Sequence, residues 1–222
     1  MAFEGPAPVD YQNVCALNRA YLSLLQENRR ARRSLHQLSS PLCRRITSLT
    51  RHQVDRLSAT PLLLLSLRER DDKLWEQILA DESGHDLFTR PVADDLDRLQ
   101  SASLGFVWQL SRQNPYTLRL ICGATLHWCE QIAERTFFGL LAAAAPHPDL
   151  LELRRGNDNE LWSKLLDNGV SRETDVRTAA HVSALQTVLT RPAASVPRTW
   201  AVAACKTKDT GLRVAEYTDV RE

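Results

Sequence analysis

The sequence lacks the features of a membrane or secreted protein. Its strongest leucine run covers only residues 62–65, whereas a helix needs about 20 apolar residues to cross a bilayer. The first residues, MAFEGPAPVDYQN, are acidic and contain no apolar core, so they do not resemble a secretory signal. We therefore expect a cytoplasmic protein with no membrane partner.

Cysteine is scarce and scattered. The five residues are odd in number and form no C-x-x-C pair, so in a reducing compartment we interpret them as small buried hydrophobes rather than a disulfide framework. Cys122, His127 and Cys129 could be considered as metal ligands, but their spacing does not converge on one point in a helix. We predict no metal site and no cofactor. The cysteines are Cys15, Cys43, Cys122, Cys129 and Cys205.

Signatures of the common enzyme classes are also missing. There is no glycine-rich phosphate loop, no G-x-S-x-G and no H-E-x-x-H, and the six histidines are dispersed. Asp94, Asp95 and Asp97 form a carboxylate cluster. On a helix these side chains fan around the axis, as on a solvated acidic face. The sequence predicts a protein that is not an enzyme.

Charge is abundant but unevenly distributed. The 222 residues are 43% hydrophobic and 25% charged, which is typical of a globular protein of one ordinary or two small domains, and the net charge is only +1. Residues 29–56, however, contain eight arginines and only one acidic residue, Asp55, which gives this segment a net charge of +7. Residues 81–98 hold six acidic side chains and two arginines, a net charge of −4. The near-neutral total therefore hides a basic segment and an acidic connector.

Apolar spacing of three and four predicts an all-α fold. One helix is expected from Asp10, as N-cap, to about Leu38. Ser40-Pro41 predicts the next helix start, and Thr50 with Gln53 matches a capping box. Two short helices with a basic outer face fit a helix-turn-helix-like corner, although an ordinary helical corner with a solvated face is the commoner arrangement. The candidate DNA-binding residues are Arg29, Arg30, Arg32, Arg33, Arg44, Arg45, Arg51, His52 and Arg56.

Residues 49–79 contain a cap, a proline, a leucine run that fits a strand or an extended packing segment, a charged turn and a Leu-Trp helix. A degenerate echo appears at residues 147–166, where Pro148 aligns with Pro61 and Trp162 with Trp75, a separation of 87. We therefore expect a tandem duplication: 1–85 as a basic repeat, 86–170 as a diverged repeat, and 171–222 as a C-terminal helix and partner-docking tail. The second repeat is expected to bind a protein partner through Trp128, Phe137 and Phe138.

Further helices are expected between these motifs. One should begin at Thr89 and Pro91 and end near Asn114, and shorter helices should follow up to residue 144, one of them ending at Gly123. Ser171 is the expected cap of a helix over residues 172–189. Its predicted apolar side consists of Val176, Ala179, Ala180, Val182, Leu185 and Leu189.

The N-terminal half resembles FlhD, the helical subunit of the bacterial flagellar master activator. The resemblance covers about 65 residues. Its matching positions are LNRAYLSLLQ (17–26), Leu38, Ile46, LT (49–50), Gln53, LSAT (57–60) and R-x-R-D-D-x-L (68–74). Leu120, Gly123 and residues 147–166 carry a looser match in the second half.

This resemblance implies two FlhD-like helical repeats in a regulator that acts with an FlhC-like subunit, binds promoter DNA and recruits RNA polymerase. Related pairs control flagellar genes or the transfer of conjugative elements. Leu65 stands where the family has the cysteine that links its dimer, so the disulfide between subunits cannot form. Gln37 stands where the family has a glycine. The tandem chain would then supply within one polypeptide the two-fold pairing that the family makes between subunits.

Two functions follow from these observations. The leading hypothesis is a DNA-binding transcriptional activator subunit in a heteromeric complex, since the planar guanidinium of arginine suits phosphates and guanine edges. The alternative is a protein-interaction adaptor whose partner makes all the DNA contacts, which the near-zero net charge and the aromatic residues of the second half would favour.

Overall fold

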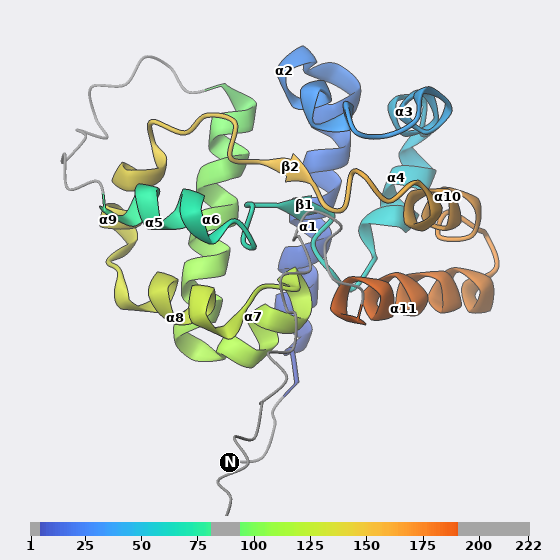
Figure 1. The fold of residues 1–222 in the computed structure, drawn as a ribbon. Coiled ribbons are helices and arrows are strands. Elements are labelled where there is room, and N and C mark those ends of the chain that lie inside the picture. Colours follow the sequence, from blue (N-terminus) through green and yellow to red (C-terminus); the bar gives the residue numbers. More distant parts are fainter. Residues whose placement is uncertain (1–4, 81–93, 191–222) are drawn as a thin grey trace, which may run out of the picture. The chain divides into compact units, whose positions relative to one another are not determined.

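Two long helices lie at the centre of the fold. The computed structural model describes residues 5–80 and 94–190, which belong to one compact unit. In it α1 (Pro8–Glu27) and α6 (Asp95–Gln113) pack against each other (Figure 1). The described chain is mostly helical and its only sheet is one pair of two-residue strands. The predicted all-α class is confirmed.

The first half arranges four short helical segments around α1. They are α2 (Arg29–Arg32), the 3-10 helix η1 (Arg33–Leu35), α3 (Ser40–Thr47) and α4 (Arg51–Ser58). The prediction of one helix over residues 10–38 is wrong, because the chain turns at Asn28. The Asn28 side chain accepts hydrogen bonds from the backbone N–H groups of Arg30 and Ala31 and starts a new helix there.

The second half arranges α7 (Pro115–Cys122), α8 (Leu126–Glu134) and α9 (Phe137–Ala144) around α6. Asn114, Thr125 and Thr136 each cap one of these helices with a side-chain oxygen. Gly123 ends α7 in the left-handed region, at φ 65°, as the sequence predicts. The expected helix start at Thr89 and Pro91 lies outside the described residues, and α6 begins after the cap Asp94.

Two short strands join the halves. β1 (Leu65–Ser66) pairs antiparallel with β2 (Glu152–Leu153), so that Leu65 lies opposite Leu153 and Ser66 opposite Glu152. Of the leucine run, only Leu65 lies in a strand, and residues 62 and 64 lie in bends, so the predicted strand is confirmed for Leu65–Ser66 alone. After the strands, α5 (Asp72–Ala80) packs against α9 of the second half, and α10 (Asn159–Asp167) packs against α3 of the first. The two predicted repeats are therefore not packed as separate bodies.

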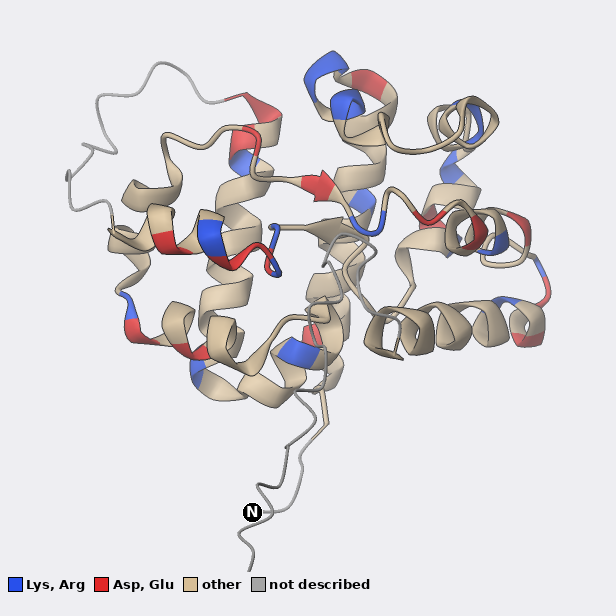
Figure 2. Ribbon diagram, viewed as in Figure 1, with Lys and Arg blue, Asp and Glu red and all other residues tan. Residues whose placement is uncertain are grey.

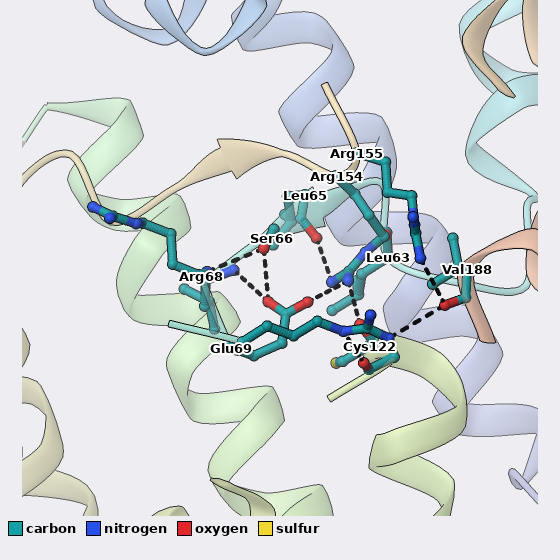
Figure 3. A network of polar contacts seen from close by, with 12 residues as sticks. Leu63, Leu65, Ser66, Arg68, Glu69, Cys122, Arg154, Arg155 and Val188 are labelled. Carbon is teal, nitrogen blue, oxygen red and sulfur yellow. Dashed lines mark hydrogen bonds and ion pairs between the residues drawn. The ribbon is translucent and has the colours of Figure 1, made fainter. Parts of the chain in front are cut away.

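A buried ion pair lies beside the strands. The guanidinium of Arg154 is bonded to the Glu69 carboxylate, and the two side chains are 6% and 4% exposed. Arg154 also donates to the carbonyl oxygens of Leu63, Leu65 and Cys122, as Figure 3 shows. This single side chain thus connects strand β2 to the leucine run and to the end of α7.

The last described helix, α11 (Thr174–Thr190), packs against α10. Its buried positions are His181, Ala184 and Val188, so the predicted apolar side is largely wrong: Val176, Val182 and Leu189 are exposed. The reason is a rotation of the helix that buries small residues and a hydrogen-bonded histidine. Among the described helices none is long and apolar enough to cross a membrane. The expected tail from Arg191 onward lies outside the described residues.

His181 makes stability dependent on pH. Its Nε2 lies 3.1 Å from the carbonyl oxygen of Gly169 and donates to it. Burial lowers the pKa of this imidazole, the Gly169 hydrogen bond opposes that change, and the charge of Arg177 lowers the pKa further. The unfolded chain therefore binds more protons near pH 6, and stability rises with pH through that region.

We expect the free energy of unfolding to fall as pH is lowered from about 7 to about 5, through the ordinary histidine pKa near 6.5. Denaturant titrations of the wild type and of His181→Gln at several pH values measure this effect. The variant should have a flatter profile, whereas His52→Gln, at an exposed position, should retain the wild-type profile. A His181→Gln profile as steep as that of the wild type would contradict the assignment.

Candidate nucleic-acid interface

The corner formed by α3 and α4 presents basic side chains outward. Leu42 and Ile46 of α3 and Val54 and Leu57 of α4 are buried, as their spacing predicts. The Thr50 hydroxyl accepts from the N–H of Gln53, and the Gln53 side chain accepts from the N–H of Thr50. The predicted capping box is confirmed, and it fixes the tight turn that joins the two helices.

Five of the nine predicted DNA-binding side chains are exposed and have no partner within residues 5–80 and 94–190. Three of them flank the corner and two lie on the α2–η1 segment, where Figure 2 also shows basic residues. Helices α2, α3 and α4 pack on α1, whereas η1 packs on α2 and strand β2. These side chains, which we call the free basic set, are Arg44, Arg51 and His52 of the corner and Arg29 and Arg33 of the α2–η1 segment.

Arg30 is directed into the protein instead. Its guanidinium lies 3.0 Å from a carboxylate oxygen of Asp94 and 3.0 Å from one of Asp97, with Asp149 at 3.8 Å. Burial alone would lower the pKa of Arg30, but the hydrogen bonds and charges of Asp97 and Asp94 outweigh it and raise the pKa. We therefore leave Arg30 out of the interface.

The acidic cluster is correspondingly not a free solvated face. Asp94 caps α6 by accepting from the N–H of Asp97 at 2.9 Å. Although partial burial would raise the pKa of Asp94, that hydrogen bond and the charge of Arg30 lower it. Asp94 and Asp97 therefore neutralise part of the basic segment, whereas Asp95 pairs with its neighbour Arg98.

Three other predicted arginines bind backbone carbonyls. Arg45 donates to the carbonyl of Leu166 at 2.8 Å and pairs with Asp167 at 2.7 Å, at the C-terminal end of α10. Arg56 donates to the carbonyl of Val170 at 3.2 Å. Arg32 donates to the carbonyls of Leu25 and Gln26 at the end of α1. Arg45 and Arg56 thus hold the corner against the second half, which orients the free basic set.

The predicted partner surface is partly corrected. Trp128 is 1% exposed and stacks edge to face on Trp75 with ring centres 5.3 Å apart, so it belongs to the core. Phe138 is 67% exposed at the start of α9, and Phe137 packs beside it. This surface continues onto α6, which sequence reasoning missed. Trp108 contacts Phe137, and the Arg112 guanidinium lies 5.2 Å from the Trp108 ring centre.

The missed contacts carried only weak signals in the sequence. Trp108 occupies one of many apolar positions along α6, and nothing local places it next to residues 29 positions later. The pairing of Arg30 with Asp94 and Asp97 could have been suspected, because a strongly basic and a strongly acidic segment attract each other in one chain. No three histidine, cysteine or acidic side chains of the described residues gather as they would around a metal ion. Comparisons with protein-family models, curated proteins and solved structures returned no match to this chain.

Proposed function

We propose that this chain is a DNA-binding subunit of a bacterial transcriptional activator that works with a second, FlhC-like subunit and through it with RNA polymerase on flagellar or transfer-gene promoters. The observation that carries the proposal is the free basic set around the α3–α4 corner. Exposed arginines with no carboxylate partner keep their full charge for a polyanion, and most of them would position the protein on phosphates rather than read bases. The FlhD-like residues of the first half support the same function.

The corner suits this role chemically. Arg51 and His52 occupy the first turn of α4, where the free N–H groups of a helix also favour anions, and Arg44 lies on the preceding helix. The three side chains are exposed together, while Arg45 and Arg56 fix the helices that carry them. A rigid support with free charges is the arrangement that phosphate contacts require.

Removing two charges from this corner tests the proposal. We expect Arg44→Ala/Arg51→Ala to lower the affinity of the full-length chain for duplex DNA. The slope of log K against log salt should become shallower by about 1.8, because each lost phosphate contact removes about 0.9. Fluorescence anisotropy with a labelled duplex at several salt concentrations measures both quantities.

The matched control removes the same charge elsewhere. Arg112→Ala/Arg119→Ala deletes two exposed arginines of the second half and should leave the slope unchanged. Equal effects of the two double variants would mean that net charge alone drives binding and that the corner is not the interface.

The adaptor function remains the second candidate, supported by the exposed Phe138 and the adjoining Phe137, Trp108 and Arg112. An exposed aromatic cluster is more typical of a protein interface than of a bare surface. A gel-shift assay separates the two functions. If the isolated chain shifts no DNA at low salt and does so only with a partner added, the adaptor function is correct.

A further inference from the structure

The two halves of the described chain match element by element at a nearly constant separation. α5 and α10 begin and end 87 residues apart, as do β1 and β2, and α1 and α6 begin 87 residues apart. The bounds of α4 and α9 differ by 86, because α6 is one residue shorter than α1. The matched positions can therefore be compared one by one.

Local hydrogen bonds repeat at the same separations. The indole N–H of Trp75 donates to the carbonyl of Leu67, and that of Trp162 donates to the carbonyl of Arg154, both at 3.0 Å. Asn28 and Asn114, 86 residues apart, cap matching helices.

The backbone repeats an uncommon conformation as well. Arg68 and Arg155 are the only non-glycine residues with positive φ in the described chain, at 56° and 49°, and they are 87 residues apart. A bulky side chain seldom adopts this conformation, so its recurrence at matched positions is not a property of helical proteins in general.

The strand register shows how the halves are related. Leu65 matches residue 152 and Ser66 matches residue 153, yet Leu65 pairs with Leu153 and Ser66 with Glu152. Leu65 therefore pairs with the residue that matches Ser66, and Ser66 pairs with the residue that matches Leu65. A two-fold axis between the strands produces this pattern. The exchange of α5 and α10 between the halves is the arrangement seen in an intertwined two-fold dimer.

The two corners that this symmetry relates differ in surface chemistry. At a separation of 86 residues, α3–α4 corresponds to α8–α9, whose exposed residues also include Glu134 and Arg135. Arg44 matches Glu130, and both are exposed. Arg51 and His52 match Phe137 and Phe138, the first two residues of α9. One corner therefore offers cations where the other offers a carboxylate and two aromatic rings.

We propose that the chain contacts a single half-site of duplex DNA, through the α3–α4 corner alone, although its fold has the two-fold framework of a symmetric binder. The inference rests on the proposed function and adds the form of the DNA site. Symmetric helix-turn-helix dimers place two equal corners in half-sites one helical turn apart and so read inverted repeats. Here the second corner would place Glu130 against phosphates, which repel a carboxylate.

Selection from a random duplex library tests the form of the site. The full-length chain is incubated at low salt with duplexes randomised over about 30 base pairs, roughly three helical turns, and bound DNA is sequenced after several rounds. We expect one asymmetric motif. An inverted repeat with half-sites about 10 base pairs apart would overturn the inference while leaving DNA binding, and hence the proposed function, intact.

Two variants of the second corner sharpen the test. Phe137→Ala/Phe138→Ala should keep the wild-type affinity and salt slope, since this corner does not contact DNA. Glu130→Arg/Phe137→Arg/Phe138→His installs the residues of the first corner and should steepen the salt slope on an inverted repeat of the selected motif by about 2.

A loss of DNA affinity in the double alanine variant as large as that of Arg44→Ala/Arg51→Ala would show that both corners bind and would overturn the inference. Should the triple variant not fold, the selection and the double alanine variant still decide. If the wild-type chain binds no duplex at any salt concentration, the proposed function itself is wrong, which is a different result from an inverted repeat.

Discussion

Replacing Arg154 by methionine is expected to lower the free energy of unfolding by about 3–5 kcal/mol, since it removes one partner of a buried ion pair. The substitution leaves the Glu69 carboxylate buried without its cation. It also leaves the carbonyls of Leu63, Leu65 and Cys122 without their charged hydrogen-bond donor. Glu69→Gln should cost less, because an amide oxygen can still accept from the Ser66 hydroxyl and the Leu67 N–H. Denaturant unfolding followed by circular dichroism at pH 7 measures both changes.

An exposed ion pair is the matched control. Arg19 and Asp55 lie 3.0 Å apart with side chains 55% and 39% exposed, so Arg19→Ala should cost less than about 1 kcal/mol. The double variant Glu69→Gln/Arg154→Met should lose less than the sum of the single losses, since the two residues share one interaction. It should still be destabilised relative to Glu69→Gln, because the three carbonyls lose their donor in either background. A loss for Arg154→Met no larger than that for Arg19→Ala would show that the network contributes little.

The second large effect is expected at the matched tryptophans. Trp75→Ala and Trp162→Ala should each lower the free energy of unfolding by about 3–5 kcal/mol, because each leaves a cavity in the core. Both indoles are fully buried, and both donate to a carbonyl eight residues earlier. Thermal and denaturant unfolding of the two variants measure the losses.

Less drastic variants separate the hydrogen bond from the packing. Trp75→Phe and Trp162→Phe keep most of the ring but leave a buried carbonyl without its donor, at a cost of about 1–3 kcal/mol. The exposed Phe138 serves as control, since Phe138→Ala should change stability by less than about 0.5 kcal/mol. Strongly unequal losses for the two tryptophans would argue against equivalent roles in the two halves.

The arginines show how tertiary contacts sort a basic segment by role. Eight arginines within 28 residues look alike in the sequence. In the fold, Arg30 binds carboxylates from the second half and Arg45 binds the end of α10, whereas Arg44 and Arg51 remain free among the described residues. Structural arginines and proposed phosphate contacts therefore alternate within the same segment. Substituting all the arginines of the segment at once would lower both the stability of the fold and the affinity for DNA, and the two effects could not be separated.

Local rules accounted for most of the secondary structure. The Thr50–Gln53 capping box, the left-handed Gly123 and the short strand in the leucine run were readable from neighbouring residues, because caps and turns depend on atoms a few positions away. The break at Asn28 was missed because an arginine-rich continuation has good helix propensity. The face of α11 was misjudged because the exposed residues Val176 and Val182 are as apolar as a core stripe.

By itself, the sequence determined the helical class and the position of the basic corner, since periodicity, capping and charge are properties of short segments. Only the tertiary structure decided which charges are free, that Trp128 lies in the core, and that α5 and α10 each pack on the opposite half. These outcomes depend on contacts between residues far apart in the sequence, such as Arg45 with Asp167, 122 positions apart, and Arg154 with Glu69, 85 positions apart. The residues of a short segment do not determine such partners, because these contacts depend on how the whole chain packs.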